Sequence, residues 1–93
     1  MEHFEPLSPD DILVCRAVYQ SPEGNTTLDK VVSQYWRVSG KPLVDVKYVE
    51  RALDKLKSNG LIETEVSNRR DHAEGTILYE VTQKGKEELG VGK

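Results

Sequence analysis

The sequence contains a single cysteine, Cys15, and no apolar run that approaches the roughly 18 residues needed to span a bilayer. One cysteine cannot close an internal disulfide, so the chain does not depend on the cross-links that stabilise small secreted domains. The N-terminal residues also lack the basic and then apolar segments of a signal peptide. These absences predict an intracellular, cytoplasmic protein that does not use a membrane as a partner.

Residues suited to catalysis or metal binding are also scarce. The two histidines, His3 and His72, lie near no second ligand or nucleophile at a workable spacing. Asp71, His72 and Glu74 form one cluster that could bind a metal weakly, but such a polar stretch is more often only solvated. The seven glycines fit turns, caps and tails, and they form no phosphate-binding loop. We therefore expect no enzyme activity, no cofactor and no metal site.

The 93 residues show no break in composition, which predicts one domain with flexible ends at residues 1–7 and 90–93. A domain this small is near the lower limit for burying enough surface alone, so a partner subunit would suit it. The net charge of −3 argues against a broad field that attracts nucleic acid. Residues 47–72, with six basic and five acidic side chains, are the least acidic part. Any phosphate contact must therefore come from a few arranged side chains.

The segment between Asp45 and Gly60 has the strongest helical pattern in the chain. Asp45 is a suitable N-cap, and Gly60 is the residue expected just past a helix end, where a positive φ is needed. One face carries apolar side chains, with Ala52 at its edge: Val46, Val49, Leu53 and Leu56. The opposite face carries cations at i, i+4 spacing, with Tyr48 beside them: Lys47, Arg51 and Lys55. This predicts a helix over about residues 45–59 that packs on a small core and offers its basic face to phosphates or base edges.

A first helix is predicted from Ser8 to about Tyr19. Ser8 is a suitable N-cap, Pro9 fits the first helical position, and acidic residues follow in the first turn, where the helix dipole favours them. The helix is apolar almost all round, which places it at the centre of the fold. Cys15 is then a small core residue, and a reactive or intersubunit thiol is the alternative.

A second helix follows the turn at residues 20–25, capped by Thr26 or Thr27. Its apolar face is formed by Leu28, Val31, Val32 and Tyr35. Trp36 lies off that face. It either shields the edge of the core or contacts a second subunit, because exposed aromatic residues are enriched at interfaces.

After Gly60 the apolar pattern changes from a helical to an alternating period. Residues 61–66 and 77–82 predict two strands, joined by the polar segment 67–76 as a long hairpin tip. Thr82 then caps a short last helix that ends near Leu89. The order of elements predicts an α+β fold of the winged helix-turn-helix type. It has a three-helix core, a two-stranded β-hairpin wing and a short C-terminal helix.

Two stretches resemble the MarR- and PadR-like winged-helix regulators of transcription. Residues 44–63 end the third helix with Leu-x-x-x-Gly-Leu-Ile, from Leu56 to Ile62. Residues 78–89 contain Tyr-x-Val-Thr-x-x-Gly, from Tyr79 to Gly85, where those families usually have leucine at the position of Val81. The resemblance implies a sequence-specific double-stranded DNA-binding protein that regulates transcription, acting as a homodimer on a two-fold site.

The resemblance also implies which residues would meet the DNA. The third helix would enter the major groove, and the wing at 67–76 would reach flanking DNA. Lys47 and Arg51 would donate to phosphates or to guanine, Tyr48 would contact a phosphate or a thymine methyl, and Lys55 would contact the backbone. At the tip of the wing, Arg69 and Arg70 would enter the minor groove, and Asn68 would assist them.

The same residues allow a second interpretation, a winged-helix module that binds another protein and no DNA. Glu50 and Asp54 neighbour Arg51 and Lys55 at spacings that give ordinary ion pairs on a solvated helix face. The acidic total charge agrees with this alternative. Both interpretations place the functional surface on the third helix and the hairpin.

Overall fold

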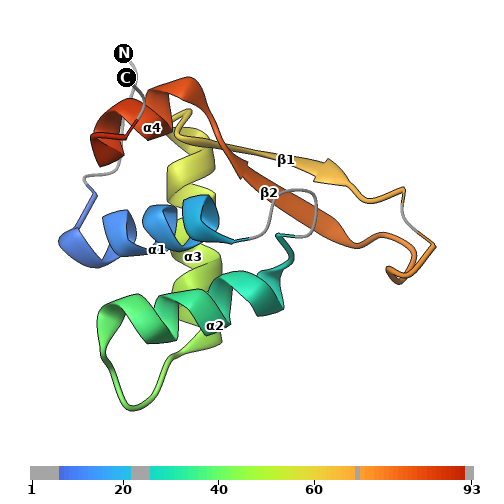
Figure 1. The fold of residues 1–93 in the computed structure, drawn as a ribbon, viewed down its shortest axis with the longest axis horizontal. Helices are drawn as coiled ribbons and strands as arrows, with labels where there is room; N and C mark the ends of the chain where they lie inside the picture. The colour runs from blue at the N-terminus through green and yellow to red at the C-terminus, as the bar shows by residue number, and fades with distance from the viewer. Residues whose placement is uncertain (1–6, 22–25, 69, 92–93) are drawn as a thin grey trace.

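The computed structural model describes residues 7–21, 26–68 and 70–91. Its elements are α1 (Pro9–Gln20), α2 (Leu28–Ser39), α3 (Val46–Ser58), β1 (Ile62–Val66), β2 (Ile77–Val81) and α4 (Gln83–Leu89). Figure 1 shows the three long helices packed together, with the hairpin extending away from them and α4 returning beside α1. The predicted α+β layout is confirmed: a two-stranded antiparallel hairpin follows three helices and is followed by a short one.

The helix ends are set by local side chains. At α1, Ser8 and Asp11 form a reciprocal cap, in which each side chain accepts a hydrogen bond from the backbone N–H of the other. Thr27 caps α2, and Asp45 caps α3 by accepting from the N–H of Lys47 at 3.0 Å. Gly60 follows α3 with a φ of 76°, a conformation that favours glycine. The predicted caps are therefore confirmed.

The core lies around α1, as its apolar sequence predicted. Cys15 is fully buried there, so the prediction that it is a core residue is confirmed. The side chains that α3 buries are Val49, Ala52, Leu53 and Leu56. Val46 differs from the prediction, because 44% of its surface remains exposed. It begins the helix, and the residues buried against α1 start only at Val49.

The wing is an antiparallel hairpin whose register runs from Ile62 opposite Val81 to Val66 opposite Ile77. The expected apolar face is buried only near the helices, where Ile62 and Val81 join the core. Val66 and Ile77 are exposed, because the outer half of the hairpin extends beyond the three-helix body (Figure 1). The prediction of two strands is correct, but their alternation does not predict how far the core reaches along them.

The inner edge of β2 is joined to the segment that precedes α2. The N–H of Tyr79 donates to the carbonyl of Thr26 at 2.9 Å, so this segment lies beside β2 as one residue of a third strand would. Leu78 is buried beside it, although sequence alternation places Leu78 on the same face as the exposed Glu80. The body of the protein therefore covers part of both faces of β2.

The two sequence stretches with the family resemblance meet where α3 leads into β1. Thr82 donates its N–H to the carbonyl of Leu61 at 3.0 Å and its hydroxyl to the carbonyl of Gly60 at 2.6 Å. The same hydroxyl accepts from the N–H of Gly85, which caps α4. Gly85 packs directly on the backbone of Leu61, and a Cβ there would lie 2.1 Å from its carbonyl oxygen. This contact explains physically why the sequence has glycine at this position.

Candidate nucleic-acid interface

The buried face of α3 determines which side chains its other face presents. Since Val49 and Leu53 point into the core, Lys47 and Arg51 lie on the outward side, and both are exposed. They are four residues apart, about one helical turn, so they lie on the same side of α3, opposite its buried face. Lys47 and Arg51 are thus the two predicted α3 residues whose charged groups are available to a ligand.

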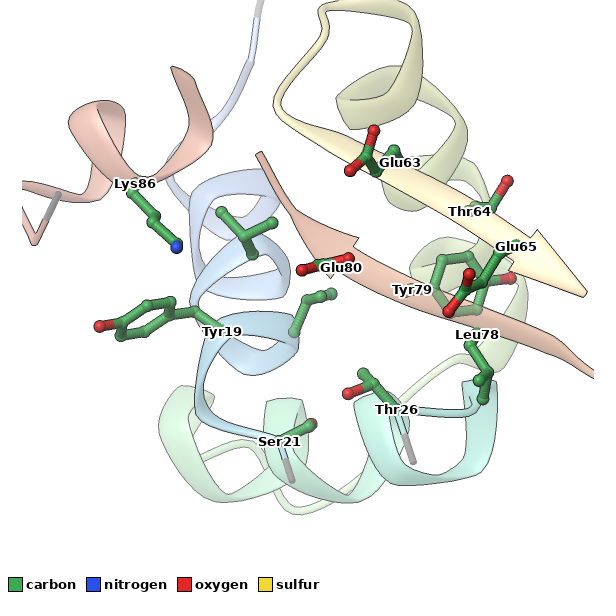
Figure 2. A pocket seen from close by; sticks show the side chains of 12 residues that line it. Tyr19, Ser21, Thr26, Glu63, Thr64, Glu65, Leu78, Tyr79, Glu80 and Lys86 are labelled. Carbon is green, nitrogen blue, oxygen red and sulfur yellow. The ribbon is translucent and has the colours of Figure 1, made fainter. Parts of the chain in front are cut away.

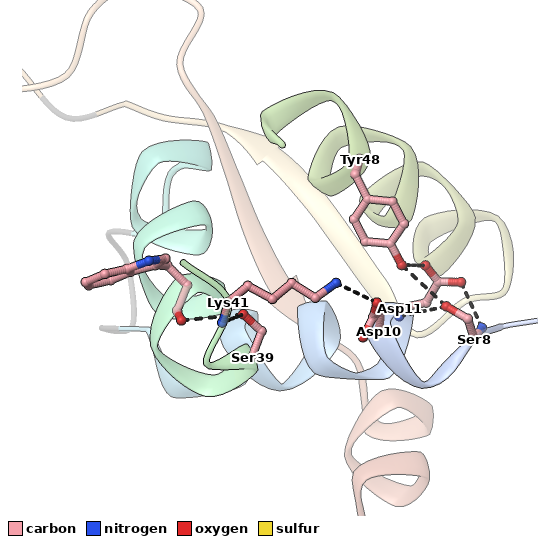
Figure 3. Close-up of polar contacts among 7 residues, drawn as sticks. Ser8, Asp10, Asp11, Ser39, Lys41 and Tyr48 are labelled. Carbon is pink, nitrogen blue, oxygen red and sulfur yellow. Dashed lines mark hydrogen bonds and ion pairs between the residues drawn. The ribbon is translucent and has the colours of Figure 1, made fainter. Parts of the chain in front are cut away.

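Tyr48 has a different position from the one its sequence neighbours suggest. It is half-buried, and its hydroxyl donates to a carboxylate oxygen of Asp11 at 2.8 Å and lies 3.3 Å from the Ser8 hydroxyl (Figure 3). Its ring also lies 6.2 Å from that of Tyr35, centroid to centroid. Burial, together with the neighbouring Asp11 carboxylate, raises the pKa of Tyr48 to about 12. Tyr48 therefore joins α3 to α1 in this structure.

Lys55 points toward the same carboxylate. Its ammonium nitrogen lies 3.5 Å from Asp11, and about a third of its side chain remains exposed. Asp11 itself is fully buried. Burial alone would raise its pKa, but hydrogen bonds from the Ser8 N–H and the Tyr48 hydroxyl, with the charge of Lys55, outweigh burial and lower the pKa. Asp11 is thus held ionised between the two helices.

Sequence reasoning did not identify this role of Asp11. The Ser8-x-x-Asp11 pattern indicates a helix cap, and the cap is present. The link to Tyr48 joins residues 37 positions apart, and neither local spacing nor charge pattern indicates it. A second such link joins Lys41 to Asp10 at 2.8 Å, and the Lys41 nitrogen lies 5.9 Å from the centre of the Tyr48 ring. The first link joins the start of α3 to the start of α1, and the second joins the connection between α2 and α3 to the same end of α1.

The wing residues lie well away from this cluster. Asn68 and Arg70 are exposed on the segment between β1 and β2, at the outer end of the hairpin. Arg69, the third residue predicted for the tip, lies outside the described residues. The segment is closed by a hydrogen bond from the Ser67 N–H to the Thr76 carbonyl at 2.8 Å. The structure therefore offers two separate exposed basic positions, one on α3 and one on the wing.

Acidic side chains adjoin the basic side of α3. Glu50 and Asp54 are exposed on the same helix, and both help to raise the pKa of Tyr79, although burial of that tyrosine contributes most. Glu50 lies three residues after Lys47 and Asp54 three residues after Arg51, so each carboxylate adjoins a cation on the helix surface. The outward surface of α3 is a narrow line of cations beside a line of carboxylates, and it is not a broad basic patch.

Within the part of the chain that the structure describes, no group of three His, Cys, Asp or Glu side chains is arranged to hold a metal ion. Nor does any described helix have the length and apolar character required to cross a membrane.

The fold and the outward side of α3 together give the layout of a small winged-helix domain. No protein-family model matches the chain, and no curated protein is significantly similar to it. The function must therefore be argued from the geometry of the site.

Proposed function

We propose that the protein is a cytoplasmic, sequence-specific double-stranded DNA-binding regulator of transcription, similar in design to the MarR- and PadR-like regulators. In this proposal α3 enters the major groove, and the wing at 67–76 contacts flanking DNA. One observation carries the proposal: the buried Asp11 holds α3 against α1 through Tyr48 and Lys55, while Lys47 and Arg51 remain exposed on its outward side. A rigid helix with free cations along one side is what groove recognition requires.

We assign different roles to these side chains because they lie at different positions on α3 and the wing. Arg51 lies near the middle of α3, where a guanidinium can donate two parallel hydrogen bonds to the O6 and N7 atoms of guanine. Lys47, in the first turn, suits a phosphate that flanks the groove. Tyr48 and Lys55 act mainly by positioning the helix. On the wing, Asn68 and Arg70 would contact the DNA backbone or the minor groove beside the α3 site.

The acidic residues beside the cations would contribute to specificity. Glu50 and Asp54 would repel phosphates wherever α3 lies in a wrong register, so weak non-specific binding is expected. Few cations are available, so the salt dependence should correspond to only a few phosphate contacts, at about 0.9 in log–log slope for each contact.

A homodimer on a two-fold site is part of the proposal. Two copies would present their α3 helices to major grooves about 34 Å apart. The exposed Trp36 on α2, with 52% of its surface accessible, supplies an aromatic side chain for such a contact. Sedimentation equilibrium of the wild type and of Trp36→Lys tests this part, and a wild-type protein that stays monomeric on its DNA site would contradict it.

Selection from a random duplex pool tests the proposed function. Protein-bound duplexes are enriched over several rounds, and binding of the enriched duplex is then measured by fluorescence anisotropy at about 50 and 200 mM salt. We expect one enriched sequence, bound more weakly at the higher salt. No enrichment and no retained DNA at the lower salt would reject the proposal.

A second candidate is a winged-helix module that binds a protein through the same helix. It is favoured by the acids interleaved with the cations of α3, where Glu50 and Asp54 adjoin Lys47 and Arg51. A stable protein partner that Arg51→Glu releases, together with no DNA binding, would favour this candidate over the first.

A further inference from the structure

A groove of about 820 Å³ lies between the hairpin and the end of α1 (Figure 2). Its apolar and aromatic lining comes from two residues of α1 and three of β2: Val18, Tyr19, Leu78, Tyr79 and Val81. Its acidic lining comes from three side chains of the hairpin, Glu63, Glu65 and Glu80. The volume is within the range of about 300–1,000 Å³ that is common for ligand sites.

The groove and the outward side of α3 are separate surfaces. Side chains alternate between the two faces of a strand, so Glu63 and Glu80 lie on the face opposite that of Ile62 and Tyr79. Ile62 belongs to the core, and none of the described residues that line the groove comes from α3. The glutamates therefore lie on the face of the hairpin directed away from α3.

The strand register places like charges together in this groove. Glu63 is directly opposite Glu80, and Glu65, two residues further along β1 on the same face, is the diagonal neighbour of Glu80. Directly opposed residues have Cβ atoms about 4.5–5.5 Å apart, and like charges at that position destabilise a hairpin. Lys86 of α4 is the one cation among the described residues that line the groove. A cationic group from outside would relieve the repulsion.

Tyr19 adds an aromatic side chain to the lining, at the end of the groove beside Lys86 (Figure 2). It is exposed at the end of α1 and lines the groove together with the glutamates. A guanidinium stacks on an aromatic ring and also makes two parallel hydrogen bonds to a carboxylate. Leu78 and Val18 provide an apolar surface for neighbouring aliphatic groups. Acidic, aromatic and aliphatic linings together match an arginine flanked by aliphatic residues.

We propose that this groove docks an extended, arginine-bearing segment of a protein partner. One guanidinium lies between Glu63 and Glu80, an aliphatic neighbour packs on Leu78, and the segment continues toward Tyr19 at the α1 end of the groove. This site is independent of DNA binding by α3, so a DNA-bound protein could hold a second protein on its other side.

The test uses a fluorescein-labelled Val-Arg-Val-Arg-Val peptide and the full chain. We expect the wild-type protein to bind this peptide. The Glu63→Gln/Glu80→Gln variant should bind it at least tenfold more weakly, and Tyr19→Ala should bind it several-fold more weakly. The matched control is Glu87→Gln/Glu88→Gln, which removes two exposed carboxylates of α4 outside the groove and should leave binding unchanged. A Val-Glu-Val-Glu-Val peptide should not bind.

The variant Glu63→Lys distinguishes a loss of peptide binding from a loss of folding. It replaces a like-charge pair with an opposite-charge pair across the strands, so it should raise the Tm while abolishing binding of the arginine peptide. Amide chemical shifts on adding the peptide should change at Tyr19, Leu78 and Glu80. Absence of binding at millimolar peptide, equal binding to the double Gln variant, or shifts centred on α3 would overturn the proposal.

Discussion

The hydroxyl of Tyr48 donates a 2.8 Å hydrogen bond to the buried carboxylate of Asp11, joining the first turn of α3 to the first turn of α1. The same carboxylate accepts from the Ser8 N–H at 2.9 Å and so caps its own helix. The side chain of Asp11 thus both caps the N-terminus of α1 and positions α3. The orientation of the proposed recognition helix therefore depends on Asp11, although Asp11 is itself buried away from any ligand.

Replacing Tyr48 by phenylalanine removes this bond and keeps the ring. A hydrogen bond to a charged group contributes about 1.5–3 kcal/mol, and its loss leaves the Asp11 carboxylate less well satisfied. We expect Tyr48→Phe to lower the free energy of unfolding in urea by about that amount. Tyr19→Phe removes an exposed hydroxyl and should change it by less than about 0.5 kcal/mol. If Tyr48→Phe and Tyr19→Phe lowered the free energy of unfolding equally, the hydrogen bond from Tyr48 to Asp11 would not stabilise the protein.

The ionisation of Asp11 predicts how stability depends on pH. Its pKa in the folded protein is lowered from the ordinary 3.8, because the hydrogen bonds from Ser8 and Tyr48 and the charge of Lys55 outweigh burial. A lowered pKa means that the contribution is complete above the unfolded value and disappears as the pH falls through the folded value. Wild type should therefore exceed Asp11→Asn in unfolding free energy at neutral pH, and the gap should narrow as the pH falls from neutral to below the ordinary pKa of 3.8. A gap that is constant over this range would exclude ionisation as its source.

Local signals in the sequence predicted the elements but not their contacts. Ser8, Asp45 and Gly60 act within a few residues of their own positions, so the helix ends followed from the sequence. Tyr48 and Lys47 are adjacent and both appear on the basic side of α3. Which of them turns toward Asp11 depends on how α1 and α3 cross, and that angle is set by packing throughout the core.

Burial along the wing was harder to predict for a similar reason. Val66 and Ile77 follow the same alternation as Ile62 and Val81, yet only the second pair is buried. Alternation identifies the face of a strand, whereas burial depends on where the helices end. The opposed Glu63 and Glu80 also required the register, which sequence spacing alone does not give.

Gly85→Ala should destabilise the protein, although glycine-to-alanine changes inside helices usually stabilise. The added methyl would lie 2.1 Å from the Leu61 carbonyl oxygen and 2.6 Å from a methyl of Val81. Overpacking of this kind costs about 1–3 kcal/mol, and contact with rigid backbone favours the upper part of that range. Urea unfolding measures the loss, with Glu87→Ala on the exposed side of α4 as the control. A Gly85→Ala protein as stable as this control would show that Leu61 and α4 are not in contact.

Cys15 should resist alkylation until the protein unfolds. Burial raises its pKa to about 11, so about one thiol in a thousand is ionised near pH 8, and its side chain is inaccessible. Mass spectrometry after iodoacetamide treatment should show little adduct in buffer and full adduct in urea. A cysteine placed at the exposed Ser33 should react rapidly in both conditions. Complete labelling of native Cys15 within minutes would contradict its position in the core.

Arg51 and Lys47, both exposed on α3, should affect DNA binding in different ways. Arg51→Ala should weaken binding to the selected duplex by about 1–3 kcal/mol and have little effect on a scrambled one, because it removes a base contact. Lys47→Ala should weaken both duplexes similarly and reduce the slope of log K against log salt by about 1, because it removes a phosphate contact. Anisotropy titrations measure both, and Arg16→Ala on α1 is the charge-matched control. If Arg51→Ala weakened both duplexes equally, Arg51 would be a phosphate ligand, and sequence recognition would have to come from other residues of α3 or the wing.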